Sequence, residues 1–141
     1  MMMFTQYPIN LIGVLVAAIA AMAVGFAWYS PLFFGKQWMT LMKLTAKDME
    51  KAKKDMGIMY GLSFLATLVM TYVLAYFIQR TGANDLSQAA ILGFWAWLGF
   101  VAPVQLTDVL FGSKKWNLFF LNTSYQLTSI VAAALVLGFL A

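Results

Sequence analysis

Asp108 is the one carboxylate of this sequence that falls inside a long apolar segment, about one turn before that segment ends. A carboxylate at this position could have either of two roles. It can reach water or pair with Lys36, Lys114 or Lys115 in the flanking loops, which we favour because the position is shallow. Alternatively it handles a proton or another cation, as carboxylates inside membranes do.

A second polar group lies in the last apolar segment, where Asn122, Tyr125, Gln126 and Ser129 recur every three or four residues. At about 3.6 residues per turn, these four side chains share one face of a helix. The face either hydrogen-bonds to neighbouring helices, which we favour, or forms the polar wall of a cavity for a small ligand or a lipid headgroup.

Cysteine and histidine are absent from the 141 residues. Their absence excludes disulfides, thiol catalysis, metal sites built from Cys or His, and histidine proton chemistry. The sequence also has no nucleophile beside a base and no glycine loop of the kind that cradles phosphate. We therefore expect a protein that is not an enzyme, with no catalytic residue, no cofactor and no metal.

The composition indicates one membrane domain over residues 1–141. Hydrophobic residues make up 63% of the chain and charged residues 10%, against roughly 45–50% and 25% in soluble domains. A soluble domain of this size could not cover its surface with so few charged groups, because most of its residues would face water. A lipid bilayer removes that requirement.

Four apolar stretches are each long enough for the roughly 20 residues that a membrane-spanning helix needs. They cover about residues 9–29, 57–78, 89–111 and 118–140. The expected fold is all-α, an integral membrane four-helix bundle. Pro103 predicts a kink in the third helix, where Gln105 or Thr107 could bond the carbonyl that the proline leaves free.

Small residues at four-residue spacing predict close contacts between helices. The first stretch has Gly13, Ala17, Ala21 and Gly25 in series, and Gly57 opens a similar series in the second. Such faces serve contacts inside the bundle or between subunits. We favour the first use for any one face, and we expect a homo-oligomer or a larger membrane complex.

Positive charge marks one side of the membrane. The loop 30–56 carries most of the lysines, Lys114 and Lys115 follow the third stretch, and the opposite side has only Arg80. By the positive-inside rule, both termini face outward and the protein is a multi-pass component of the plasma (inner) membrane. Lysines so placed meet membrane lipids, and nucleic acid is not an expected partner.

The loop 30–56 is itself expected to contain helix. Thr45 and Asp48 have the spacing of a capping box, which predicts a helix that begins near Ala46 and runs unbroken into the second stretch. The second helix would thus extend into the cytoplasm. The segment before it is expected to lie along the headgroups, with Trp38 as its anchor.

The motif Trp28-Tyr29-Ser30-Pro31-Leu32-Phe33-Phe34-Gly35-Lys36 resembles an uncharacterised family of small prokaryotic membrane proteins, domain of unknown function 1761. The likeness resumes at Trp116-Asn117-Leu118-Phe119 and covers essentially the whole chain. It implies a four-span membrane protein and brings no activity, substrate or catalytic residue. It also suggests that certain residues form one unit: Trp28, Tyr29, Pro31, Gly35, Lys36, Trp38, Asn122 and Tyr125.

Three functions remain open. The first, which we favour, is a non-enzymatic scaffold or accessory subunit that self-associates or joins a membrane complex. The second is a small transporter or channel for a small solute or ion, with the polar face of the fourth helix along the path and Asp108 near its inner mouth. The third, ranked last, is a lipid-modifying enzyme that holds phosphate with Lys36.

Overall fold

A computed structural model describes residues 9–30, 32–83, 85–112 and 115–140, and all regular structure in them is helical. The all-α class is therefore confirmed for the part of the chain that the structure describes. In chain order the elements are α1 (Leu11–Trp28), α2 (Gly35–Leu41), α3 (Ala46–Ala52), the 3₁₀ turn η2 (Lys53–Asp55), α4 (Met56–Thr81), α5 (Leu86–Phe100), α6 (Ala102–Phe111) and α7 (Trp116–Leu140).

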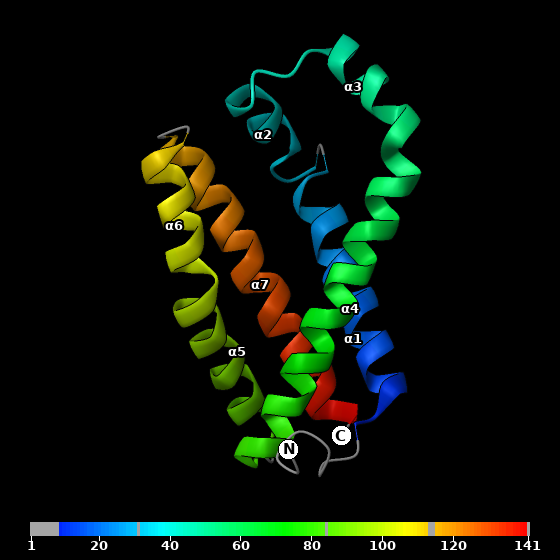
Figure 1. The fold of residues 1–141 in the computed structure, drawn as a ribbon, viewed down its shortest axis with the longest axis vertical. Coiled ribbons are helices and arrows are strands. Elements are labelled where there is room, and N and C mark those ends of the chain that lie inside the picture. Colours follow the sequence, from blue (N-terminus) through cyan, green and yellow to red (C-terminus); the bar gives the residue numbers. More distant parts are fainter. Residues whose placement is uncertain (1–8, 31, 84, 113–114, 141) are drawn as a thin grey trace.

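In the part of the chain that the structure describes, four helical stretches are long and apolar enough to cross a membrane, as expected. They are Leu11–Trp28, Ala46–Thr81, Leu86–Phe111 and Trp116–Leu140. The shortest has 18 residues, which at about 1.5 Å per residue nearly matches the roughly 30 Å hydrocarbon core of a bilayer. Both ends of the described chain lie together, since the Asn10 amide donates to the Leu140 carbonyl at 3.1 Å (Figure 1).

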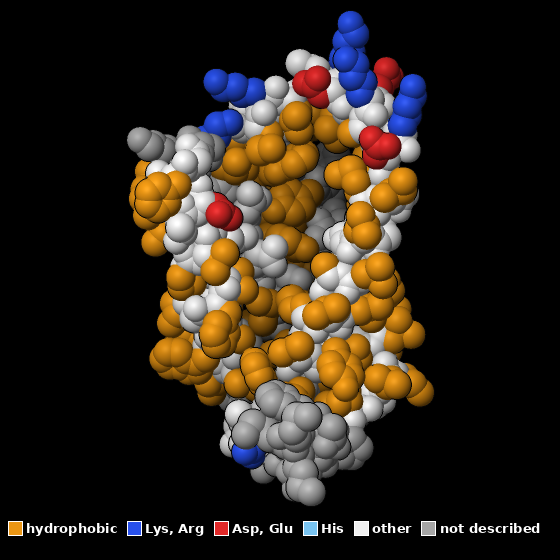
Figure 2. Space-filling view, viewed as in Figure 1, with side chains coloured by type: hydrophobic (Ala, Val, Ile, Leu, Met, Phe, Trp, Pro, Cys, Tyr) orange, Lys and Arg blue, Asp and Glu red, His pale blue; other side chains and the backbone are white. Residues whose placement is uncertain are grey.

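The opposite end of the bundle, formed by α2, α3, η2 and the start of α7, is called the lysine-rich end below. Figure 2 shows nearly all the basic side chains gathered there. The described lysines at this end are Lys36, Lys43, Lys47, Lys51, Lys53, Lys54 and Lys115. Arg80 lies in the last turn of α4, at the other end.

At the lysine-rich end, α3 begins where the sequence predicts. The Thr45 hydroxyl accepts from the Asp48 N–H at 3.1 Å, and the Asp48 carboxylate accepts from the Thr45 N–H at 3.0 Å. This reciprocal capping box satisfies two N–H groups that a helix start leaves free. The expected unbroken helix is interrupted once, by the 3₁₀ turn Lys53–Asp55 between α3 and α4.

The third span is divided at Val101, where φ is −113° and ψ is −56°. Pro103 occupies the first turn of α6, a position that suits proline because the N–H it lacks would have no helical partner there. The break thus lies two residues before the expected kink. The Thr107 hydroxyl donates to the carbonyl of Pro103 itself, at 2.9 Å, and not to the carbonyl one turn before the proline.

α7 is the centre of the bundle, with α1 and α5 as its main neighbours and α4, α6 and α2 in further contact (Figure 1). Small side chains allow this close packing. Ala17 of α1, Ala89 of α5, and Ala133 and Ala134 of α7 are fully buried. A Cβ placed on Gly93 of α5 would lie 3.1 Å from the Ala134 Cβ, so α5 approaches α7 as closely as glycine permits.

α4 and α5 make few contacts with each other. Between them lies an apolar groove of about 390 Å³. Figure 2 shows a hollow on the face between α4 and the α5–α6 pair, with hydrophobic side chains around it. The residues that line the groove are Val69, Met70, Val73, Leu74, Phe77, Ala96, Phe100, Val101 and Ile130.

Candidate functional site

The end of α1 is fastened to α7 by two hydrogen bonds from aromatic side chains. The Trp28 indole N–H donates to the Leu121 carbonyl at 3.2 Å, and the Tyr29 hydroxyl donates to Asn122 Oδ1 at 2.7 Å. Both contacts join residues 93 positions apart in the chain. We call the rings and amide gathered here, those of Trp28, Tyr29, Trp38, Asn122 and Tyr125, the aromatic layer.

A tight turn after α1 positions the side chains of the aromatic layer. The Tyr29 N–H bonds the Gly25 carbonyl at 3.1 Å, and the Gly35 N–H bonds the Ser30 carbonyl at 2.9 Å, which folds the chain back before α2. A Cβ on Gly35 would lie 2.5 Å from the Tyr29 carbonyl oxygen and 2.8 Å from the Ser30 carbonyl carbon. Only glycine fits there, since both obstacles are backbone atoms.

Tyr125 packs into the aromatic layer from α7. Its ring lies 5.2 Å from the Tyr29 ring at 65°, an edge-to-face arrangement. Trp38 of α2 also contacts Tyr29, with ring centres 5.7 Å apart. A Cβ on Gly25 would lie 3.0 Å from the Tyr125 hydroxyl. The small residue at the end of the α1 series therefore makes room for the tyrosine.

The polar face of α7 turns mainly toward α1. Asn122 and Tyr125 contact the end of α1, and Ser129 is 3% exposed and hydrogen-bonded to Tyr125. Gln126 is partly buried on the same helix. The structure thus brings Trp28, Tyr29, Trp38, Asn122 and Tyr125 into one cluster, with Ser129 directly behind it.

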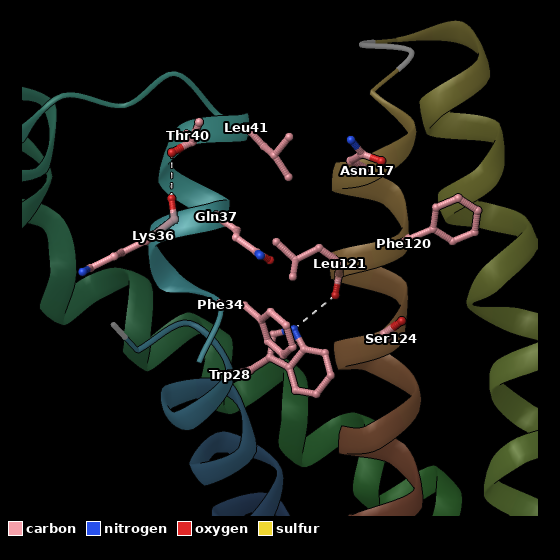
Figure 3. A pocket seen from close by; sticks show the side chains of 10 residues that line it. All are labelled: Trp28, Phe34, Lys36, Gln37, Thr40, Leu41, Asn117, Phe120, Leu121 and Ser124. Carbon is pink, nitrogen blue, oxygen red and sulfur yellow. Dashed lines mark hydrogen bonds between the residues drawn. The ribbon is translucent and has the colours of Figure 1, made fainter. Parts of the chain in front are cut away.

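Between α2 and α7 lies a cleft of about 690 Å³ at the lysine-rich end. In Figure 3, Gln37 and Leu41 of α2 point toward α7, Asn117 stands at the outer end, and the rings of Trp28 and Phe34 close the inner end. The Lys36 side chain extends from the rim, away from α7. The full lining is Trp28, Phe34, Lys36, Gln37, Thr40, Leu41, Asn117, Phe120, Leu121 and Ser124.

Asp108 lies on the exposed side of α6 and borders a smaller cavity of about 190 Å³ between α6 and α7. Asn122 and Gln105 border the same cavity. Gln105 Oε1 is buried and accepts no hydrogen bond within the described structure. Of the lysines expected near Asp108, Lys115 donates from Nζ to the Leu41 carbonyl at 3.0 Å, and Lys114 lies outside the described residues, as does Pro31 of the expected unit.

Sequence reasoning missed two contacts of tryptophan with backbone. The Trp97 indole N–H donates to the Thr123 carbonyl at 2.9 Å, joining α5 to α7, whereas its neighbour Trp95 is 61% exposed. The Trp28 bond to Leu121 has the same form. A tryptophan at membrane depth needs a partner for its indole N–H, but no sequence pattern names which carbonyl supplies it.

Three threonine hydroxyls along the spans bond within their own helices. Thr67, Thr71 and Thr128 each donate to the carbonyl four residues earlier in their own helix, at 2.8 to 3.0 Å. Such bonds satisfy the hydroxyl without a ligand. Among the described residues no three acidic side chains come together in a way that could hold a metal ion.

Comparison with protein families identifies the family of this chain. A family model described as a protein of unknown function (DUF1761) matches residues 12–138. Comparison with curated proteins finds no match, and neither does comparison with solved structures. The matched stretch contains every helix described above except the first residue of α1 and the last two of α7.

Proposed function

The chain belongs to the DUF1761 family, whose function is unknown, and on that premise we propose that it is a non-enzymatic scaffold or accessory subunit that self-associates in the membrane. The observation that carries the proposal is a long face of α4 that the described residues leave uncovered. Gly57, Gly61, Leu65, Val69 and Val73 follow one another at four-residue spacing, and all five are exposed.

This α4 face has the form of a helix-docking surface. A Cβ added to Gly57 or Gly61 would meet nothing within 4 Å. Two glycines four apart let a second backbone approach closely, which is how helices associate in lipid. Farther along α4, Val69 and Val73 form one edge of the groove toward α5, so the face continues into a space that a helix could enter.

A second copy of this chain is the occupant that we assign to the face. A glycine pair at four-residue spacing is self-complementary, because the same pair on a copy related by a two-fold axis supplies the matching flat surface. The groove contributes apolar side chains alone, which suits a lipid-embedded helix and offers nothing to a charged partner. The polar groups of α7, in contrast, are engaged largely in contacts with α1.

The test is the oligomeric state of the full chain in mild detergent, by native mass spectrometry over a range of protein concentrations. Gly61→Leu should shift the protein to monomer, since a leucine there fills the approach surface without touching its own fold. Gly99→Leu is the matched control, because a Cβ on Gly99 also meets nothing within 4 Å. A wild-type monomer at every concentration, without a co-purifying partner, would rule the proposal out.

A second candidate function, a small transporter or channel, is favoured by the cavity beside Asp108. Its carboxylate, the unpartnered Gln105 oxygen and the Asn122 amide give a space of about 190 Å³ that suits a small cation or protonated solute. Flux into liposomes by the purified protein tests it, with Asp108→Asn as the variant and Asp55→Asn, an exposed carboxylate outside the cavity, as control. No flux, or equal flux from both variants, removes this candidate.

For orientation, we propose that the lysine-rich end faces the cytoplasm of a cell whose plasma (inner) membrane holds the protein. Both termini then face outward, and α3 extends into the cytoplasm. The positive-inside rule supports this arrangement. Because the chain has no cysteine, Lys53→Cys and Ser87→Cys can be labelled singly in sealed vesicles. The two thiols should react from opposite faces, and reaction from the same face would refute the topology.

A further inference from the structure

The cleft between α2 and α7 changes character along its length. Gln37, Thr40 and Asn117 line its outer part, and Lys36 lies at the rim. The inner part is closed by the rings of Trp28 and Phe34, with Phe120 and Leu121 on the α7 side (Figure 3). Leu41 also lies at the outer end and Ser124 at the inner end (Figure 3). A ligand that fits therefore meets most of the polar side chains at the end near the lysines and most of the apolar ones at the end toward the bundle.

The depth of the cleft matches the boundary between headgroups and hydrocarbon. Its α7 wall runs from Asn117 to Ser124, within the first nine residues of a helix that begins at Trp116, or about 12 Å along the axis. The headgroup layer is roughly 5–8 Å thick on each side of a bilayer. The outer part of the cleft therefore lies among headgroups, and its inner part reaches the first carbons of the acyl chains.

The charged residues on the chain segments that form the two walls are all lysines, and Asp108 borders the separate cavity between α6 and α7. From Asn10 to Leu44, which includes the end of α1 and all of α2, the only charged residues are Lys36 and Lys43. From Val109 to Leu140, which includes α7, they are Lys114 and Lys115. The Lys115 ammonium lies against the Leu41 carbonyl at the cleft wall. An anion in the cleft therefore meets positive charge and no carboxylate on either wall.

From these three observations we propose that the cleft between α2 and α7 is a binding site for the headgroup of an anionic glycerophospholipid. The phosphate lies beside the Gln37 and Asn117 amides, which supply hydrogen-bond donors. The Lys36 side chain, which points away from α7 in Figure 3, turns back over the rim toward the phosphate when the lipid binds. The glycerol and the first part of one acyl chain lie over Phe120 and Leu121. The volume of about 690 Å³ is within the usual range for ligand pockets, roughly 300–1,000 Å³.

The experiment measures how many lipids the purified full-length protein retains in native mass spectra from mixed micelles. Phosphatidylglycerol and phosphatidylcholine with identical chains are offered in equal amounts. Wild type should retain one phosphatidylglycerol per chain in preference to phosphatidylcholine. Lys36→Gln should lower that retention roughly fivefold, because one lysine near an anionic surface contributes about 1 kcal/mol. Lys36→Arg should restore it.

Lys51→Gln is the matched control, since Lys51 is an exposed lysine of the same end on α3, outside the cleft. Equal retention of the two lipids by wild type would overturn the proposal, and so would equal losses in Lys36→Gln and Lys51→Gln. A third arm adds inorganic phosphate. Displacement of the lipid by millimolar phosphate would assign the cleft to a soluble anion. A monomer that still selects phosphatidylglycerol would contradict self-association and leave this inference intact.

Discussion

The hydrogen bond between Tyr29 and Asn122 tests whether the polar side chains of α7 hold helices together. Tyr29→Phe removes only the hydroxyl, because the phenylalanine ring can keep the edge contacts with Tyr125 and Trp38. Asn122→Ala removes the acceptor. Measured with the double variant, the two changes form a cycle that isolates the energy of the contact.

The geometry of the Tyr29–Asn122 contact sets the coupling energy that we expect. The donor and acceptor are 2.7 Å apart and partly buried, which is the usual distance for an O–H···O hydrogen bond. Coupling energies of hydrogen bonds between membrane helices average about 0.6 kcal/mol and reach about 1.7 kcal/mol. A bond of this usual length that is partly buried, on a tyrosine in contact with two further aromatic rings, belongs in the upper half of that range. We therefore expect a coupling energy of about 1–1.7 kcal/mol.

The assay is reversible unfolding of the four proteins in mixed micelles, followed by helix circular dichroism. The control cycle pairs Tyr29→Phe with Thr128→Ala, whose hydroxyl bonds within its own helix at 2.9 Å. Those two changes should add within about 0.3–0.5 kcal/mol. If the Tyr29–Asn122 cycle is equally additive, the contact does not fasten α1 to α7, and the assignment of Asn122 to helix packing is wrong.

Three further predictions follow from the packing. Gly93→Leu should destabilise the bundle by at least about 1–3 kcal/mol, because its side chain would enter the contact with Ala134 and Ile130. The control Gly99→Leu should leave the unfolding midpoint nearly unchanged. Equal midpoints for the two variants would contradict the close α5–α7 contact. Gly35→Ala should open the turn after α1, so that the Trp28 indole N–H exchanges faster with solvent in NMR spectra. The control is Gly57→Ala, whose added Cβ meets no atom within 4 Å. Equal exchange rates in the two variants would refute the steric argument. Thr45→Ala should lower the stability of the start of α3 by about 0.5–2 kcal/mol, seen as faster exchange of the Asp48 amide. The control Thr40→Ala, which removes a hydrogen bond to the Lys36 carbonyl at 2.9 Å, should not affect that amide. Equal exchange in both variants would show that the cap contributes nothing.

The helices could be predicted from sequence because their signals are local. Apolar runs of about 20 residues identify spans without any knowledge of the neighbours, and the capping box at Thr45 depends on residues three apart. The 3₁₀ turn at Lys53–Asp55 was not predicted, and the break in the third span was expected at Pro103 but lies at Val101. Both are adjustments of a few backbone angles, and their positions depend on how the flanking helices pack.

The sequence predicted only in part which residues come together in the aromatic layer. Asn122 and Tyr125 share a helix face by spacing, and the family resemblance suggested that they belong with Trp28 and Tyr29. Spacing along one helix does not say which side of a neighbour it meets, because that depends on helix rotation and crossing angle. The indole bonds to Leu121 and Thr123 and the cleft beside α2 therefore required the three-dimensional arrangement.

The central place of α7 has a consequence for biogenesis. α1, α4 and α5 are synthesised before the helix against which all three pack. While the ribosome is still making α7, the earlier spans lack their common partner, and the donors Trp28, Tyr29 and Trp97 have no acceptor from it. Nascent chains stalled before Trp116 should therefore stay bound to insertion factors or be degraded, and release should come only once α7 has entered the lipid.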